Sequence, residues 1–186
     1  MARVDVLRKD SVRNMIMPIS VEQYHKFGES GLIAEKTELM EGIIFRKMTK
    51  SPLHEFIASR LYDFFAKRAG NDYWVRKESP LTLATSELEP DISIVRGRID
   101  EFVTRHPDYA ELVIEVAVSS LELDREKAMS YAAAGIPEYW IVRPADKLAE
   151  CYSQPEQGRY RKKQIVTAGQ SMPSVWGELI LAKLFA

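Results

Sequence analysis

Residues 112–118 read LVIEVAV, an apolar run interrupted once, by Glu115. The length of the run and its β-branched residues are typical of a central strand that is covered on both faces. A carboxylate inside such a strand costs several kcal/mol unless it is paired or binds a metal. Glu115 therefore predicts a compensating positive charge, either an arginine such as Arg96 or Arg125, or a metal ion.

The segments on both sides of this run predict alternating helices and strands. A helix is expected over 121–134, because Gly135 ends it and Pro137 prevents its continuation. Another is expected from Ser51 and Pro52, which suit a helix cap and first turn, up to Gly70. The remaining predicted elements are two strands within 37–47 around a turn at Glu41 and Gly42, strands at 73–75, 81–84, 92–95, 139–142, 148–152 and 163–167, and a helix or strand at 178–185.

This order predicts an α/β or α+β fold in which helices flank a central mixed β-sheet. With 186 residues, 46% of them hydrophobic, the chain is long enough for one substantial core and too short for two full domains. Ser20 and Gln23 have the spacing of a capping box, which predicts a short helix that ends near Gly28 or Gly31. We therefore predict a flexible segment over 1–19 and a single domain over 20–186.

The composition limits the classes of partner. The formal net charge is −1, from 26 basic and 27 acidic residues, so the chain lacks the overall positive field of non-specific nucleic-acid binders. Any nucleic-acid contact must use local basic clusters. Cys151 is the single cysteine, which excludes an internal disulfide and fits a reducing compartment. No stretch has the length and apolarity of a secretory signal or a membrane span, so we expect a cytoplasmic location and no membrane contact.

A second carboxylate predicts a metal site. Asp91 follows Pro90 at the start of the predicted 92–95 strand, and the strand period of two places Asp91, Ser93 and Val95 on one face. Carboxylates on neighbouring strands can converge on one cation, and oxygen ligands suit Mg²⁺ or Mn²⁺ better than zinc. The alternative is that Asp91 only initiates a strand.

The position of a lysine is the unusual feature of this pattern. Ala117 stands where a lysine would complete the Asp…Glu-x-Lys pattern of PD-(D/E)xK nucleases. Lys127 is a candidate replacement on the following helix, with Asp124 and Tyr131 on the same helical face. Its charge could orient the attacking water or stabilise charge in the transition state of phosphodiester hydrolysis. The alternative is an ordinary solvated helix face, because Lys127 lies in the charged turn DREK.

Several motifs in order give a specific resemblance. They are 38–42 (ELMEG), His54, Glu89–Pro90–Asp91, 115–117 (EVA) with Ser119 and Ser120, 124–127 (DREK), Tyr131, and 135–140 (GIPEYW). Together they resemble the Uma2 family of endonuclease-like proteins over about residues 20–185. The resemblance implies a restriction-endonuclease-like fold in which the catalytic lysine has moved from strand to helix.

The resemblance also implies roles for particular residues. Asp91 and Glu115 would be the metal ligands, Lys127 the catalytic lysine, Glu38 an additional acid near the site, and His54 a lining residue of the same pocket. Val118 departs from the family pattern, in which a small polar or acidic residue often precedes the serines.

Each of the remaining candidates has a simpler interpretation. His54, in the first turn of its helix, could only hydrogen-bond locally. Glu38 and Glu41 flank a turn, where solvent exposure is the default. Ser119 and Ser120 suit a helix N-cap better than a nucleophile, because no histidine motif accompanies them.

Three functions follow from these patterns. The first is a Mg²⁺- or Mn²⁺-dependent endonuclease that hydrolyses DNA, for which we expect a homodimer because cutting both strands requires two sites. The second is a binding or regulatory module that keeps the nuclease fold and cleaves nothing, which the near-zero net charge favours. The third is hydrolysis of a small phosphoester, which would require a closed pocket.

Overall fold

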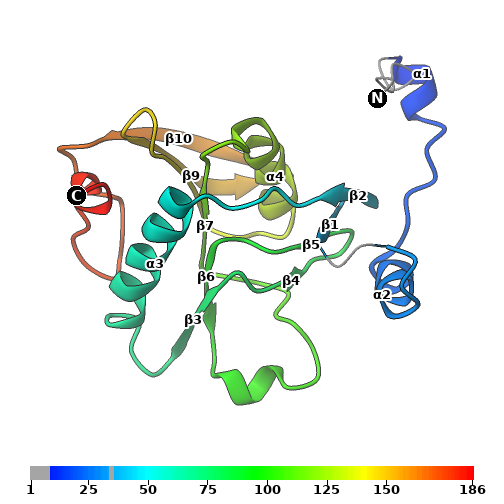
Figure 1. Cartoon of the computed structure of the whole chain (residues 1–186), viewed down its shortest axis with the longest axis horizontal. Helices are drawn as coiled ribbons and strands as arrows, with labels where there is room; N and C mark the ends of the chain where they lie inside the picture. The colour runs from blue at the N-terminus through cyan, green and yellow to red at the C-terminus, as the bar shows by residue number, and fades with distance from the viewer. Residues whose placement is uncertain (1–8, 34–35) are drawn as a thin grey trace.

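The structure of the chain, a computed structural model, describes residues 9–33 and 36–186. The predicted flexible segment 1–19 therefore lies partly outside the described residues. Its described part holds a one-turn helix, α1 (Asp10–Arg13), and an extended arm that leads to α2 (Val21–Glu29) (Figure 1). The predicted capping box of α2 is confirmed, since the side chains of Ser20 and Gln23 each accept the other's backbone N–H.

A six-stranded mixed sheet forms the centre of the molecule, with the order β10-β9-β8-β7-β6-β3. Its strands are β3 (Tyr73–Lys77), β6 (Ile92–Arg96), β7 (Leu112–Val116), β8 (Glu138–Arg143), β9 (Leu148–Glu156) and β10 (Arg159–Thr167). β7 and β8 are parallel, and the other neighbours are antiparallel. The predicted α/β class with a central mixed sheet is thus confirmed, and the apolar run 112–118 supplies an inner strand, β7.

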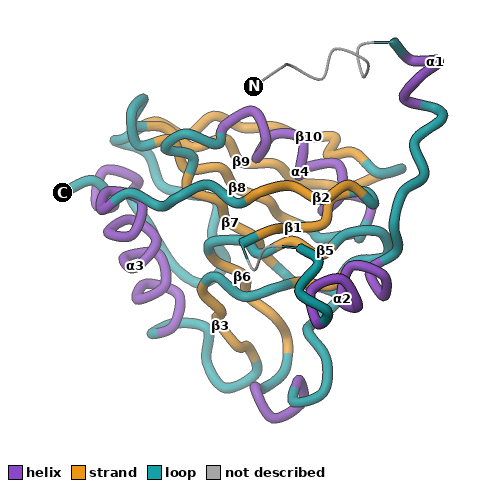
Figure 2. The backbone as a smooth tube through the Cα atoms, turned by 45° about the vertical axis from the view of Figure 1, so that its right-hand side comes forward, coloured by secondary structure: helices purple, strands orange, loops and turns teal. Residues whose placement is uncertain are grey.

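A second, four-stranded antiparallel sheet, which the sequence did not predict, lies beside α2 (Figure 2). Its order is β2-β1-β5-β4, and its strands are β1 (Thr37–Met40), β2 (Ile43–Arg46), β4 (Leu81–Thr82) and β5 (Glu87–Leu88). The predicted turn at Glu41 and Gly42 joins β1 to β2. Gly42 has φ 77°, and a Cβ there would lie 2.3 Å from Cβ of Pro18, so this close approach requires glycine.

Helices cover both faces of the large sheet. α3 (Pro52–Ala66) packs on one face, where Ile57, Leu61 and Phe65 join a buried core with Ile114 and Trp140. α4 (Leu121–Ala133) packs on the other, where a second core surrounds its Tyr131. Two 3-10 helices, η2 (Ile99–Phe102) and η3 (Leu181–Leu184), complete the described elements. Figure 1 shows α3 and α4 on opposite sides of the sheet.

Strand alternation determines which side chains face α4. In β7, Leu112, Ile114 and Val116 belong to the α3 core, whereas Val113 belongs to the α4 core. Glu115 therefore points to the α4 side.

Among the residues described, no helix combines the length and apolarity that a membrane span requires.

A buried glutamate on the α4 side of the sheet gathers the basic residues of this region. Glu150 is 1% exposed, and its carboxylate lies 2.5 Å from Arg125, 2.9 Å from Arg143 and 2.7 Å from Lys163. Burial alone would raise the pKa of Glu150, but hydrogen bonds from Arg125, Lys163 and Tyr152 hold it well below its ordinary value. Arg125 therefore stabilises the fold at this position and is not the partner of Glu115.

The ionisation of Glu150 should contribute to the stability of the protein. We expect Glu150→Gln to lower the free energy of unfolding by about 2 kcal/mol at pH 7. This loss is smaller than that for breaking a fully buried ion pair, because the cations around Glu150 are partly hydrated. Since the folded-state pKa is depressed, this contribution is present in full above the unfolded pKa and is lost progressively as the pH falls from there through the folded-state pKa, so part of it should be missing at pH 3.5. Urea unfolding at pH 7 and pH 3.5 checks the prediction. The exposed Glu156, which pairs with Arg161 at 2.6 Å, gives a control in Glu156→Gln with little change expected.

Candidate active site

Two of the predicted site residues lie side by side on neighbouring strands. Ile92 of β6 pairs with Ile114 of β7, so the antiparallel register places Asp91 opposite Glu115. The N–H of Val116 donates to Oδ2 of Asp91 at 2.8 Å, and the N–H of Asp91 donates to Oε2 of Glu115 at 3.3 Å. Both residues are 4% exposed. The sheet itself therefore fixes the two acids next to each other.

Lys127 lies at the same place and is the partner of Glu115. Its Nζ is 3.0 Å from Oε1 of Glu115 and 3.0 Å from Oε2 of Glu38, and the residue is 5% exposed. Asp124 lies 3.9 Å away one helical turn earlier, and the hydroxyl of Tyr131 lies 3.4 Å from Glu115. The lysine of α4 thus reaches Glu115 on the strand.

The arginine interpretation of Glu115 is wrong. Arg125 pairs with Glu150, and Arg96 pairs with Glu111 at 3.3 Å. The reason is topological, because Arg96 lies at the far end of β6 and is exposed, whereas Arg125 extends from α4 toward β9. The buried charge is compensated by lysine instead.

Glu38 is buried, so its default interpretation as an exposed turn residue is also wrong. It is 5% exposed in β1, whereas Glu41 in the turn itself is exposed. Oε1 of Glu38 accepts the backbone N–H of Glu89 at 2.8 Å. The alternation of β1 directs Glu38 toward the large sheet, which the sequence could not show without knowledge of the second sheet.

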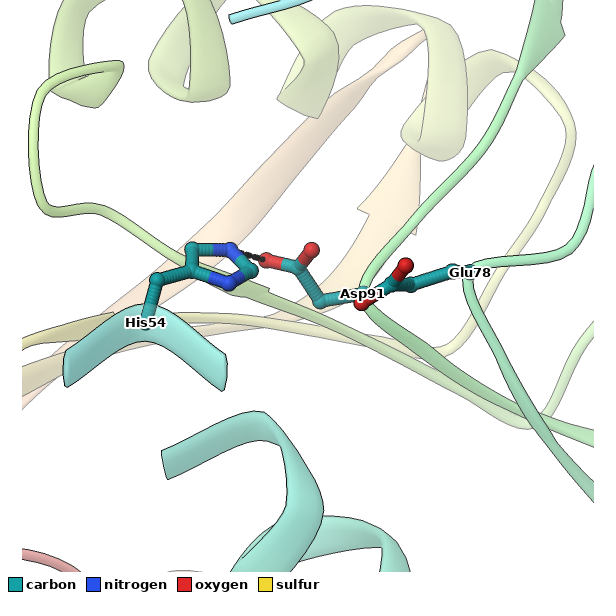
Figure 3. Close-up of side chains that lie close together, drawn as sticks. All are labelled: His54, Glu78 and Asp91. Atoms are coloured by element: carbon teal, nitrogen blue, oxygen red, sulfur yellow. Dashed lines mark hydrogen bonds and ion pairs between the residues drawn. The ribbon is translucent and has the colours of Figure 1, made fainter. Parts of the chain in front are cut away.

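His54 contacts Asp91 from the other side. Ser51 caps α3 by accepting the N–H of His54 at 3.2 Å, and Nε2 of His54 lies 2.9 Å from Oδ2 of Asp91. His54, Glu78 and Asp91 offer ligand atoms that all lie within 4.8 Å of one another, so these residues could also hold a metal (Figure 3). All five predicted site residues, Glu38, His54, Asp91, Glu115 and Lys127, are therefore brought together.

Two further residues of the site were missed by the sequence analysis. Nζ of Lys50 lies 3.0 Å from Oδ1 of Asp91 and 3.0 Å from Oε1 of Glu78. Lys50 is seen in sequence only as part of a basic cluster before the cap of α3. Glu78 has no sequence signal that we recognise. It has a left-handed backbone with φ 48°, and its N–H donates to the carbonyl of Asp91. These two features bring it to the site.

The predicted capping role of the serine pair is not found. Ser120 occupies the N-cap position of α4, but its side chain makes no capping hydrogen bond. Its hydroxyl instead donates to Oδ2 of Asp124 at 2.6 Å. Ser120 therefore orients an acid beside Lys127.

The electrostatics of the site show a shortage of positive charge. Burial raises the pKa of Glu115 well above its ordinary value, although the charge of Lys127 opposes the shift. Burial also raises the pKa of Asp124 to about 6. Burial acts in the same direction on Asp91, but the hydrogen bond and charge of His54 and the charge of Lys50 give it a net lowered pKa. Lys127 stays charged, because the surrounding carboxylates outweigh its burial and raise its pKa.

These side chains line a cavity of about 80 Å³. Among the described residues, five carboxylates and three lysines line it, which leaves a formal charge of −2 with His54 neutral. The carboxylates are Glu38, Glu89, Asp91, Glu115 and Asp124, and the lysines are Lys47, Lys50 and Lys127. A proton on Glu115 or a bound cation would reduce this imbalance.

Comparison with known proteins supports a nuclease-like fold. The sequence model of the Uma2 family, described as "Putative restriction endonuclease", matches residues 21–179. A solved structure from Anabaena variabilis ATCC 29413, described as a "putative nuclease belonging to DUF820", is similar with a TM-score of 0.72. Its sequence is 17% identical, and the match covers 90% of this chain and 98% of that chain. No curated protein matches the sequence.

Proposed function

Because the chain belongs to the Uma2 family, we propose that it is a divalent-metal-dependent endonuclease that hydrolyses phosphodiester bonds of DNA. The observation that carries the proposal is the meeting of Asp91, Glu115 and Lys127 at one small polar cavity. Two carboxylates can hold a divalent cation and an ammonium can stabilise charge on a phosphate, and both functions suit metal-assisted phosphodiester hydrolysis.

The residues fit a hard divalent cation. Asp91 and Glu115 offer carboxylate oxygens, which Mg²⁺ and Mn²⁺ prefer as ligands. The lining is two unit charges short of neutrality, and Glu115 has a raised pKa where a cation would favour its ionised form. We propose Asp91 and Glu115 as the ligands. His54 and Glu78 lie on the Asp91 side of this pair, because their ligand atoms and that of Asp91 lie within 4.8 Å of one another. Such an ion would activate water and neutralise charge on the phosphate.

The other residues would position these groups and stabilise charge. Lys127 is held by Glu38 and Glu115, so its ammonium is directed at the same cavity with little freedom. It would stabilise the negative charge that develops on the phosphate oxygens. His54 and the N–H of Val116 would hold the carboxylate of Asp91 in one orientation.

The form of the cavity favours a polymer over a small phosphoester. Sites that enclose a small organic ligand have volumes of roughly 300–1,000 Å³. The cavity of about 80 Å³ has room for an ion and a phosphate group, and lysines line its edge. A DNA strand would lie across it with one phosphate at the site. Cutting both strands requires two such sites, so we expect two copies of the chain to act together.

Cleavage of supercoiled plasmid DNA and of short duplexes tests the proposal. We expect nicked and linear products with Mg²⁺ or Mn²⁺ and none with EDTA, and no products from Glu115→Gln in either metal. Activity that persists in Glu115→Gln would contradict the assignment of this site. DNA binding without cleavage in any divalent metal would instead select a non-cleaving module with a nuclease fold.

A further inference from the structure

The loop that joins β2 to α3 lines the cavity with five successive residues, 47–51. We call this loop the strap; in Figure 1 it leads from the small sheet to the start of α3. Two lysines connect the strap to acids outside it. Lys47 pairs with Glu89, and Lys50 pairs with both Glu78 and Asp91. The side chains of the strap therefore contact the site through these lysine ion pairs and through Ser51, which accepts the N–H of His54.

The carboxylate of Asp91 is fully engaged in this arrangement. Oδ2 lies within 2.9 Å of His54 and 2.8 Å of the N–H of Val116, and Oδ1 lies 3.0 Å from Lys50. A cation that binds Asp91 must share or displace one of these contacts. The N–H of Val116 is fixed in the sheet, and His54 is buried on α3. Lys50 has a flexible side chain that is 28% exposed, so its contact is the easiest to exchange.

The ammonium of Lys50 also stands where a cation would be attracted. It is equidistant from carboxylates of Asp91 and Glu78, at 3.0 Å from each, and these two acids with His54 form the cluster whose ligand atoms lie within 4.8 Å. Lys50 therefore supplies the positive charge that faces Asp91 and Glu78 from the strap.

We infer that Lys50 is an exchangeable counter-ion, which holds Asp91 in the metal-free protein and moves to a DNA phosphate when a divalent cation binds. The inference rests on the proposed function and adds an order to its steps. The cation binds first, and the ammonium of Lys50 then becomes available to contact a DNA phosphate. Lys127 cannot do the same, since it is 5% exposed and held by two glutamates.

This inference predicts effects of opposite sign in two measurements. In Lys50→Met, the affinity for Mn²⁺ without DNA should rise by about tenfold, because the competing charge is gone. The affinity for duplex DNA should fall, and the slope of log K against log salt should decrease in magnitude by about 0.9, the value for one phosphate contact. A lysine with only a structural role would weaken both affinities or neither.

Calorimetric titration with Mn²⁺ and DNA-binding titrations over a salt series give the two readouts. The DNA titrations use Ca²⁺, with a gel to verify that the duplex stays intact. Lys47→Met is the matched control for the metal readout, because Lys47 lies on the same strap but pairs with Glu89. Lys162→Met, on β10 and outside the cavity lining, is the control for the DNA readout. Unfolding curves establish that each variant is folded, and Lys50→Gln repeats the test with a polar side chain.

The outcomes separate this inference from the proposed function. The exchange is supported if Lys50→Met binds Mn²⁺ more tightly than the wild type and its DNA binding has a smaller salt slope. The same conclusion holds if Mn²⁺ binding is detectable in Lys50→Met but not in the wild type. The exchange is overturned if Lys50→Met binds Mn²⁺ no more tightly than the wild type, or if its salt slope for DNA binding is unchanged. In that case metal binding by the wild type leaves the proposed function intact. If neither protein binds a divalent cation, the proposed function fails and the exchange fails with it.

Discussion

Lys127→Met is expected to slow DNA cleavage at saturating Mg²⁺ by at least about 100-fold, the cost typical of losing one group that stabilises transition-state charge. Lys127 is 5% exposed, and its ammonium lies 3.0 Å from both Glu115 and Glu38. Its charge therefore acts in a region with little water, where electrostatic stabilisation is strong. Methionine has a similar length, so it removes the charge with little change in packing. Single-turnover cleavage of a labelled duplex measures the effect.

A matched lysine and a ligand variant make this result specific. Lys163→Met removes a lysine from an ion pair with Glu150, at 2.7 Å, that does not line the cavity, and its cleavage rate should stay near that of the wild type. Asp91→Asn should lose cleavage for a different reason, because it weakens metal binding, which calorimetry with Mn²⁺ detects. A rate for Lys127→Met within about threefold of the wild type would rule out a catalytic role for this lysine.

The second large effect is on stability. Lys127→Met should lower the free energy of unfolding by about 3–5 kcal/mol at pH 8 in EDTA, the cost of leaving buried carboxylates without a partner. Glu115, Glu38 and Asp124 would then share a cavity that has lost its central cation. The double variant Lys127→Met/Glu115→Gln removes one of these charges, and it should recover a large part of the loss.

The pH dependence of this loss has a definite sign. The pKa values of Glu115 and Asp124 are raised by burial, that of Asp124 to about 6, and removal of Lys127 would raise them further. A carboxyl group with a raised folded-state pKa binds more protons when folded, so stability increases as the pH falls toward its unfolded pKa. The cost of Lys127→Met should therefore be greatest at pH 8 and smaller at pH 5. Urea unfolding at both values measures it.

A control separates burial from charge alone. Lys26 pairs with Glu22 at 2.6 Å on α2, and both side chains are exposed, at 66% and 76%. Lys26→Met should change stability by less than about 0.5 kcal/mol, as for most exposed pairs. Equal losses for Lys26→Met and Lys127→Met, or no recovery in the double variant, would contradict the importance of the buried lysine.

The predicted elements with a strong periodic pattern agree with the structure. The apolar run with Glu115, the helix that stops at Gly135, and the helix that begins at Ser51 all appear close to their predicted bounds. Helical spacing, which places Asp124, Lys127 and Tyr131 on one face, made Lys127 a candidate, but only the resemblance to the Uma2 pattern favoured it over a solvated helix face. Strand alternation and the preceding Pro90 placed Asp91 at the start of a strand, and its combination with Glu115 and Lys127 favoured a site role over a simple strand start. Such patterns depend on residues that are close in the chain.

The partners of the buried charges depended on the tertiary structure alone. Nothing near Glu115 in the sequence distinguishes Lys127 from Arg125, because both lie on the same helix; the packing of that helix directs one to β7 and the other to Glu150. Glu38 is buried only because a second sheet forms, and Lys50 and Glu78 meet only across two loops. Backbone periodicity is local and readable from the chain. The choice of ion-pair partners follows instead from strand order, register and helix packing, which bring together residues far apart in the sequence.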